Sequence, residues 1–202
     1  VSLLLPAVEP QLSELRHNFD YLGGFGVMLV DSVRWQNRVE PGPKIYYDLD
    51  PQDRSRLAQG VANAARMMLR AGARKIYLPT SEDLLGDGNP ARGRLLEIRH
   101  EDQLARVARN LKFVPGMTLL TSAHMQSTCK TGEVVDAQGR VKGVTGLWVA
   151  DSSVFPSSIG ANPMQSIYTL ARIFALQQVH DGLHRGSSYS SISDVITDLP
   201  SK

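Results

Sequence analysis

The clearest alternation of apolar and polar positions lies between residues 50 and 72. Asp50 and Pro51 suit the N-cap and the first position of a helix, and Gly72 suits its end. Apolar residues recur at helical spacing between them, at Leu57, Val61, Ala64, Ala65 and Met68. The pattern predicts one amphipathic helix whose stripe packs into a core.

Short apolar runs on either side of this helix predict strands. Residues 26–35 and 44–49 read as two strands of a hairpin with a long loop, because the turn residues 40–43 lie between them. Residues 75–78 predict a further brief strand, and apolar positions at helical spacing predict a helix near residues 102–111.

From residue 118 onward the pattern changes to short apolar runs separated by turn signals. These runs predict strands over residues 118–123, 133–136, 141–144 and 147–150. The segment Asp-Ala-Gln-Gly, residues 136–139, is a turn signal.

The stretch SSVFPSSIGANPMQ, residues 152–165, lies between the last of these runs and a helical pattern. Asn162 is a good N-cap, and Pro163 suits the first helical position, where its missing N–H costs nothing. Such a helix start aims free N–H groups and a positive helix end at whatever lies before it. An ordinary capped helix and a ligand-binding helix start both fit these residues.

Composition and charge narrow the class of protein. The chain has 202 residues, of which 42% are hydrophobic and 21% charged, as in a globular protein. The net charge is +2, and its scattered Lys and Arg residues do not suggest binding to nucleic acid or to an anionic membrane. Cys129 is the only cysteine, which favours a cytoplasmic location, and no apolar run approaches the roughly 20 residues of a membrane span. The start at Val1 has no features of a signal peptide, and we expect a piece of a longer polypeptide.

The five histidines are dispersed and form no pair with metal-ligand spacing. His124 differs from the others, because it ends an apolar run and precedes the polar run from Met125 to Gly132. A histidine at the mouth of a loop is a candidate general base, although a lone histidine is more often structural. The residues alone leave both interpretations open.

Three motifs together resemble a known family. SAHMQSTCKTG, EVVDAQGRVKGVTGLWVADSSVFPSSIGANP and MQSIYTLARIFA, across about residues 121–175, are similar to the C-terminal signature of glucose-methanol-choline (GMC) flavoprotein oxidoreductases. Residues 26–73 resemble the substrate-side domain of that family. Gln126 and Ser127 depart from the pattern, since many members have a small residue and Gly there.

The resemblance implies a fold of mixed α+β and α/β class. Residues 1–118 would form part of an antiparallel-sheet substrate domain. Residues 119–185 would supply the C-terminal strands and helix of a Rossmann-like FAD-binding domain, followed by a tail over residues 186–202.

The resemblance also implies a cofactor, FAD, and a set of site residues. His124 would take the proton of an alcohol as hydride passes to the flavin, and Asn162 would hold the alcohol oxygen. The residues next to the cofactor would be Asp151, Ser152, Asn162, Pro163 and Met164. It implies no metal ion.

The substrate and the partner follow from two further features. The form Gly-x-Asn-Pro-Met, residues 160–164, looks most like sterol oxidases and long-chain alcohol oxidases. A Gly-x-Gly-x-x-Gly fingerprint occurs nowhere in the chain, so the FAD-binding N-terminal portion of the same enzyme is the expected partner. A non-catalytic remnant or assembly module, or a lyase of the same fold, is the alternative to an alcohol oxidase or dehydrogenase.

Overall fold

The computed structural model of the protein describes residues 7, 9–32, 34–42, 44–88 and 95–184. The chain divides into two compact units: unit 1 comprises residues 1–32 and 48–122, and unit 2 comprises residues 33–47 and 123–202. The predicted tail over residues 186–202 lies outside the described residues. The assignment of residues 1–118 and 119–185 to a substrate-binding and a FAD-binding domain stays a prediction.

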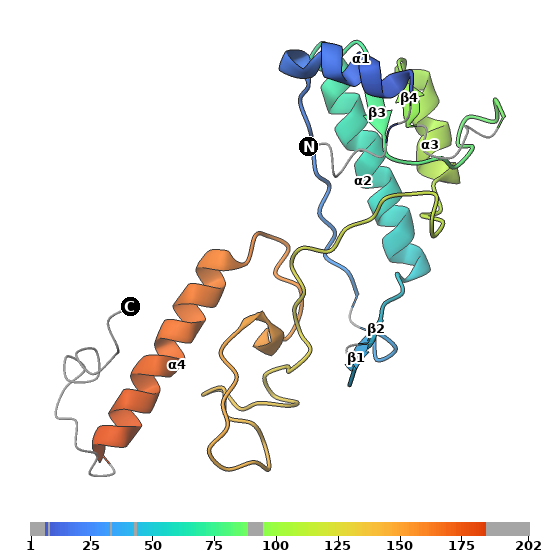
Figure 1. Cartoon of the computed structure of the whole chain (residues 1–202). Helices are drawn as coiled ribbons and strands as arrows, with labels where there is room; N and C mark the ends of the chain where they lie inside the picture. The colour runs from blue at the N-terminus through green and yellow to red at the C-terminus, as the bar shows by residue number, and fades with distance from the viewer. Residues whose placement is uncertain (1–6, 8, 33, 43, 89–94, 185–202) are drawn as a thin grey trace. The chain divides into compact units, whose positions relative to one another are not determined.

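The longest element of unit 1 is helix α2, Pro51–Arg70, which confirms the helix predicted after residue 50 (Figure 1). Asp50 is its N-cap, and the Asp50 carboxylate accepts a hydrogen bond from the Gln52 amide at 2.8 Å. Gly72 follows the helix end with a φ of +99°, a left-handed conformation that glycine adopts without strain.

The other elements of unit 1 surround α2. They are α1 (Gln11–His17), the short 3₁₀ helices η1 (Phe19–Tyr21) and η2 (Glu101–Gln103), the strands β3 (Ile76–Leu78) and β4 (Leu96–Ile98), and α3 (Leu104–Asn110). The two strands pair antiparallel, with Ile76 opposite Ile98. The strand predicted over residues 75–78 and the helix predicted near residues 102–111 are both confirmed.

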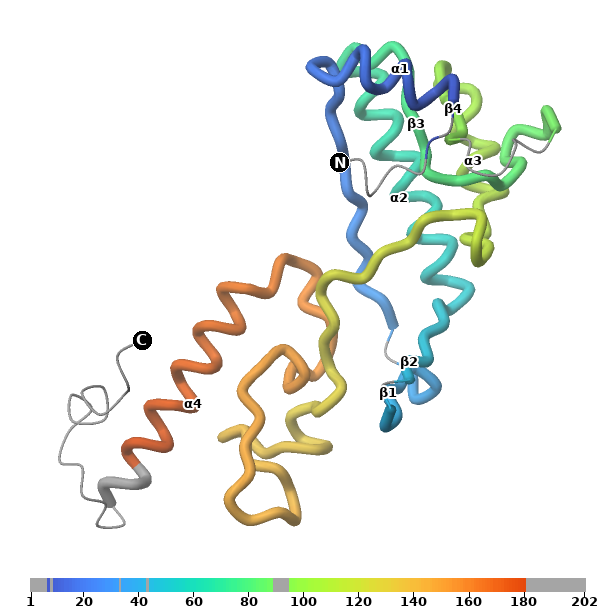
Figure 2. The backbone as a smooth tube through the Cα atoms, in the orientation of Figure 1, coloured from blue at the N-terminus to red at the C-terminus, as the bar shows by residue number. Residues whose placement is uncertain are grey.

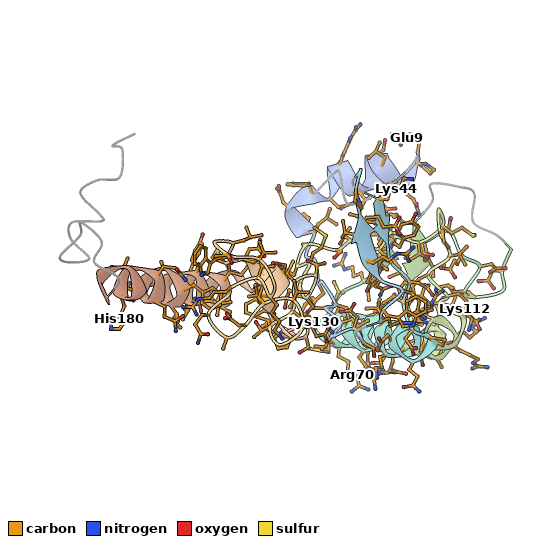
Figure 3. The ribbon with its side chains drawn as sticks, turned by 90° about the horizontal axis from the view of Figure 1, so that it is seen from below. Glu9, Lys44, Arg70, Lys112, Lys130 and His180 are labelled. Atoms are coloured by element: carbon orange, nitrogen blue, oxygen red, sulfur yellow. The ribbon has the colours of Figure 1, made fainter. Side chains whose placement is uncertain are left out.

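The core of unit 1 lies where α2 and α3 meet the β3–β4 pair. Ile98, Leu104 and Val107 are completely buried there. The other buried members of this core are Ala58, Ala62, Ala65, Ile76, Leu84, Leu85 and Leu111. The Arg70 guanidinium at the end of α2, labelled in Figure 3, pairs with Glu101 of η2 at 2.9 Å.

A buried carboxylate, that of Glu82, organises the loop after α3. It accepts hydrogen bonds from the Lys112 amide at 2.9 Å, from the Val114 amide at 3.0 Å and from the Thr118 hydroxyl. Phe113, between the two amides, has a φ of 54°, which is uncommon for a bulky residue. Glu82 therefore stabilises a strained turn by satisfying its main-chain donors.

The strand predicted over residues 26–35 is wrong. Residues 23–32 run as an extended ribbon beside α2 (Figure 1), where a Cβ on Gly60 would lie 2.8 Å from Val27. The main chain of residues 23–30 forms no hydrogen bond to any described residue. The segment has the shape of a strand but no neighbour to pair with, and Met28 and Val30 are exposed.

The predicted hairpin exists, but with a different first strand. Strand β1 (Arg38–Glu40) pairs antiparallel with β2 (Lys44–Tyr46), with Val39 opposite Ile45. The Arg38 guanidinium lies 4.3 Å from the centre of the Tyr46 ring. This hairpin belongs to unit 2. The described residues thus hold mixed α and β structure with two small antiparallel sheets, as predicted, while the Rossmann-like arrangement stays a prediction.

The strands predicted over residues 118–123, 133–136, 141–144 and 147–150 are also wrong, since only isolated bridges form there. Figure 2 shows the backbone of residues 123–163 winding irregularly before the last helix. Glycines with positive φ interrupt the runs: Gly132, Gly139, Gly143 and Gly146. The predicted turn over residues 136–139 does form, because the Gly139 amide donates to the Asp136 carbonyl at 3.1 Å.

The core of unit 2 consists of Val135, Val154 and Phe174. Phe174 lies on helix α4 (Met164–His184), and its ring covers Gly139 so closely that a Cβ there would lie 2.6 Å from it. The same Cβ would lie 2.8 Å from the Val149 carbonyl oxygen. The irregular loops thus pack on α4 at a point where only glycine fits.

Candidate functional site

All the residues predicted to act on substrate or cofactor lie in unit 2. They are His124, Asp151, Ser152, Asn162, Pro163 and Met164. Three main-chain hydrogen bonds hold the segment after His124 against the segment after Asp151. They run from Ser127 N to Ser152 O (3.3 Å), from Cys129 N to Ser153 O (2.9 Å) and from Thr131 N to Val154 O (2.9 Å). The structure therefore brings these distant segments side by side.

His124 lies at the start of this paired region, in a stretch without regular secondary structure. Its side chain is exposed, and the imidazole forms no hydrogen bond within the part of the chain that the structure describes. The His124 carbonyl accepts a long hydrogen bond of 3.4 Å from the Gln126 side chain. The imidazole is thus open to a substrate.

The backbone after His124 is fixed by two unusual features. Ser127 has a φ of 71°, in the left-handed region that glycine adopts more easily, at the position where the resembling family has Gly. The Ser152 hydroxyl donates to the Met125 carbonyl at 2.8 Å. Ser152 thus holds the loop next to His124, a structural role that the sequence did not reveal.

Asp151 is the N-cap of the short 3₁₀ helix η3, Ser152–Val154. Its Oδ1 atom accepts hydrogen bonds from the Ser153 amide at 2.8 Å and from the Ser153 hydroxyl at 2.5 Å. The structure assigns Asp151 a local capping role, and its contact with a cofactor stays a prediction.

The start of α4 differs by one residue from the prediction. The Pro163 carbonyl accepts the first helical hydrogen bond, from the Ile167 amide at 2.8 Å, so Pro163 rather than Asn162 holds the N-cap position. Asn162 is exposed, and its side chain has no hydrogen bond to a described residue. The prediction of Asn162 as a cap is therefore wrong, and its carboxamide is available to a ligand.

The first turn of α4 presents further donors. The amides of Met164, Gln165 and Ser166 have no acceptor within the described residues, as expected for the first turn of a helix. Gly160, with a φ of +69°, turns the chain just before them. A helix end of this kind, with an exposed Asn162 beside it, offers hydrogen-bond donors and a positive potential to an electron-rich group.

One residue that the sequence did not single out for a role links the two halves of the site. The Gln126 carboxamide accepts a hydrogen bond from the Ile159 amide at 3.2 Å, while its nitrogen faces the His124 carbonyl. Ile159 lies three residues before Asn162. No hydrogen bond joins the His124 and Asn162 side chains themselves among the described residues.

No group of three or more His, Cys, Asp or Glu residues with metal-binding geometry is present in the described ranges. Within the same ranges, no helix combines the length and the apolar character needed to cross a membrane. His180, the histidine labelled on α4 in Figure 3, lies on the exposed surface of that helix.

Comparisons with known proteins point to one family. The sequence profile of the GMC oxidoreductase C-terminal domain matches residues 29–171. An uncharacterized GMC-type oxidoreductase of Sinorhizobium fredii is 34% identical over 152 residues, which cover 72% of this chain and 28% of the relative. An uncharacterized GMC-type oxidoreductase of Mycobacterium tuberculosis is 28% identical over 190 residues, covering 88% of this chain and 27% of the relative.

A third relative carries a more specific name. A long-chain-alcohol oxidase of Arabidopsis thaliana is 28% identical over 181 residues, which cover 84% of this chain and 22% of the relative. The chain thus spans about a quarter of the length of the curated relatives it matches. No solved structure matches it significantly.

Proposed function

The chain belongs to the GMC oxidoreductase family, and from this premise we propose that it takes part in the flavin-dependent oxidation of an alcohol. His124 is the proton acceptor in this proposal, and Asn162 binds the alcohol oxygen. One observation carries it: the imidazole of His124 and the carboxamide of Asn162 are both exposed and without a described partner, in segments that Gln126 joins.

The family is generally FAD-dependent, and the start of α4 fits that cofactor. When bound, FAD supplies the acceptor for the hydride of the alcohol carbon. Asn162, Pro163 and Met164 would hold its pyrimidine end at the positive end of the helix. Asp151 and Ser152 precede these residues in the chain. We propose that the polar atoms of Asp151 and Ser152 that form no local hydrogen bond contribute to the same binding surface.

The chemistry of this chain's own residues is a proton transfer with an oriented substrate. A neutral imidazole at His124 takes the hydroxyl proton, while an N–H of the Asn162 carboxamide donates to the developing alkoxide oxygen. Holding both groups on one substrate oxygen fixes the C–H bond in a single orientation.

We propose a bulky or aliphatic alcohol as the substrate, in the class of long-chain or sterol-like alcohols. Two relatives are named long-chain-alcohol oxidases. Three large apolar residues that lie near His124 or Asn162 in the sequence are also exposed, namely Met125, Ile159 and Met164. Exposed apolar side chains beside a polar pair suit a substrate with one hydroxyl and a long apolar body.

The partner that we propose is the FAD-binding portion of the same enzyme, corresponding to the length by which the relatives exceed this chain. The unpaired main chain of residues 23–30 supports it, because a strand from that portion would satisfy these hydrogen-bonding groups. On α4, Tyr168, Ile173 and Leu176 are exposed apolar residues that it would cover. A cytoplasmic location is part of the proposal and rests on the lone Cys129.

The substitution His124→Ala, made in the flavin-loaded protein, tests the catalytic assignment. The rate of flavin reduction in a single turnover is expected to fall about 10²–10⁴-fold, because general-base assistance is lost. The matched control is His180→Ala, since His180 lies sixteen residues beyond Met164 on α4, about 24 Å along the helix. Wild-type reduction by the His124 variant would refute the mechanism.

Asn162→Ala separates substrate binding from helix capping. Because the Asn162 side chain caps nothing, the free energy of unfolding should change by less than about 0.5 kcal/mol. Turnover should fall at unchanged flavin content, because a hydrogen bond to the alkoxide is lost. The two readouts are urea unfolding and single-turnover reduction. A loss of stability with full turnover would assign Asn162 to the helix instead.

A further inference from the structure

We propose that Gln126 is a positioning residue, which sets the distance between His124 and the loop that carries Asn162. The inference rests on the proposed function, because it concerns the geometry of the same two residues. Among the described residues, the Gln126 side chain forms no hydrogen bond with the side chain of His124 or of Asn162. It acts on the main chain on both sides of the site.

The carboxamide of Gln126 uses both of its ends. Its oxygen accepts from the Ile159 amide at 3.2 Å, and its nitrogen donates to the His124 carbonyl at 3.4 Å. A carboxamide carries a donor and an acceptor on one rigid plane, so one side chain can link two stretches of main chain. Gln126 lies 33 residues before Ile159 in the sequence and only two residues after His124.

No other residue supplies this link. The ladder between the two segments, which uses the amides of Ser127, Cys129 and Thr131, ends at the Val154 carbonyl. From residue 155 to residue 163, the Ile159 amide forms the only hydrogen bond to residues 124–131 among the described residues. Among the described residues, Gln126 therefore supplies the one hydrogen-bonded tie between the loop before α4 and the His124 segment.

The His124 side of the link is the rigid side. The Ser152 hydroxyl holds the Met125 carbonyl at 2.8 Å, and Ser127 keeps a left-handed φ of 71°. A side chain that starts between these two fixed points has a restricted direction. Gln126 can therefore transmit the position of the His124 segment to Ile159, and through Ile159 to Asn162 three residues later.

A small displacement at this point has a large effect on reaction geometry. A shift of about 1 Å between a catalytic group and its substrate can cost up to 10²-fold in rate. Loss of one exposed hydrogen bond allows part of such a shift, so removal of the link should lower the rate about tenfold. Flavin content should stay the same, because the start of α4 is unchanged.

Gln126→Met tests the link in the flavin-loaded protein, since methionine has a similar length but lacks the donor and the carboxamide oxygen. We expect the single-turnover rate of flavin reduction to fall about tenfold at unchanged flavin content. Amide hydrogen exchange at Ile159 should become faster as its acceptor is removed. Gln138→Met is the matched control, because the Gln138 side chain is half-buried in the same unit and has no described partner.

Gln126→Glu is the rescue variant. Its carboxylate still accepts from the Ile159 amide but cannot donate to the His124 carbonyl, so Ile159 protection should return while the rate recovers only in part. Wild-type rate and protection in Gln126→Met would overturn the proposal, as would equal impairment of the Met and Glu variants. Failure of the proposed function looks different, because His124→Ala would then reduce its flavin at the wild-type rate.

Discussion

Among the described residues, ten buried residues form the core of unit 1 beneath two helices and a pair of strands, whereas three buried residues hold the loops of unit 2 on α4. Unit 1 is built from regular elements that the apolar pattern specifies. Outside the β1–β2 hairpin and α4, unit 2 is built from turns, glycines with positive φ and single hydrogen bonds. The candidate site lies entirely in unit 2, so the chemistry is placed on the less regular backbone, where precision depends on individual contacts.

The two units can be followed separately in one experiment. Both tryptophans of the chain, Trp35 and Trp148, belong to unit 2, so tryptophan fluorescence reports unit 2 alone. Helical circular dichroism contains α2 and α3 of unit 1 together with α4. Urea unfolding followed by both signals therefore distinguishes a change in unit 1 from a change in unit 2.

The largest effect on stability is expected for Leu104→Ala in the core of unit 1. Leu104 is completely buried, and its truncation should cost about 2–5 kcal/mol of the free energy of unfolding. The dichroism transition should move to lower urea while the fluorescence transition stays in place. An equal shift of both transitions would mean that the two units unfold as one cooperative body. That result would contradict the separate stabilities expected from their separate cores.

The glycines provide a matched pair of intermediate size. At Gly139 an alanine side chain meets the Phe174 ring and the Val149 carbonyl as well as an unfavourable φ of +75°, so we expect a loss of about 2–4 kcal/mol in unit 2. At Gly72 of unit 1 the φ is +99° but nothing lies within 4 Å, so Gly72→Ala should cost about 1–2 kcal/mol. The measurements are the fluorescence and dichroism transitions, respectively. Equal costs would contradict the close packing of Phe174 on Gly139.

The smallest effect is expected for Asp53 on α2. Burial raises the pKa of Asp53, but hydrogen bonds from Ser32 at 2.6 Å and from Arg56 at 3.2 Å outweigh it and hold the pKa below the ordinary value of 3.8. A lowered pKa contributes stability above pH 3.8 that is lost as the pH falls further.

The substitution Asp53→Asn should therefore cost about 1 kcal/mol at neutral pH and progressively less in acid. The measurement is the urea transition of the dichroism signal at pH 7 and near pH 3. Asp87→Asn, in an exposed loop of unit 1, serves as the control. A difference between wild type and Asp53→Asn that stays constant with pH would show that the charge of Asp53 does not matter.

The same contrast explains how much of the molecule could be predicted from its sequence. Helices α2 and α3 and strand β3 follow from local patterns, because capping residues and apolar spacing act over a few positions. The Glu82 contacts to Lys112, Val114 and Thr118 span thirty residues or more and leave no local signal. The strands predicted in unit 2 failed because an apolar run predicts burial, and the paired neighbour that makes it a strand must come from elsewhere.

The candidate site shows the same limit. The motifs select His124 and Asn162 as candidates through the family resemblance, and the roles of both residues stay predictions. They could not reveal that Pro163 holds the N-cap position, or that Gln126 links the two segments, because both depend on the path of irregular loops. The sequence alone shows that Ser127 departs from the family motif, but only the structure shows its left-handed φ.

The bare main chain of residues 23–30 also affects how the polypeptide behaves when it is concentrated. Extended main chain without pairing partners among the described residues can pair with another extended chain, so it favours self-association of copies of the protein at high concentration. A lysine in place of Met28 or Val30, both exposed, would discourage such self-pairing while Val27 keeps its contact with α2. Met28 and Val30 are thus two exposed positions, remote in sequence from His124 and Asn162, at which self-association can be tested.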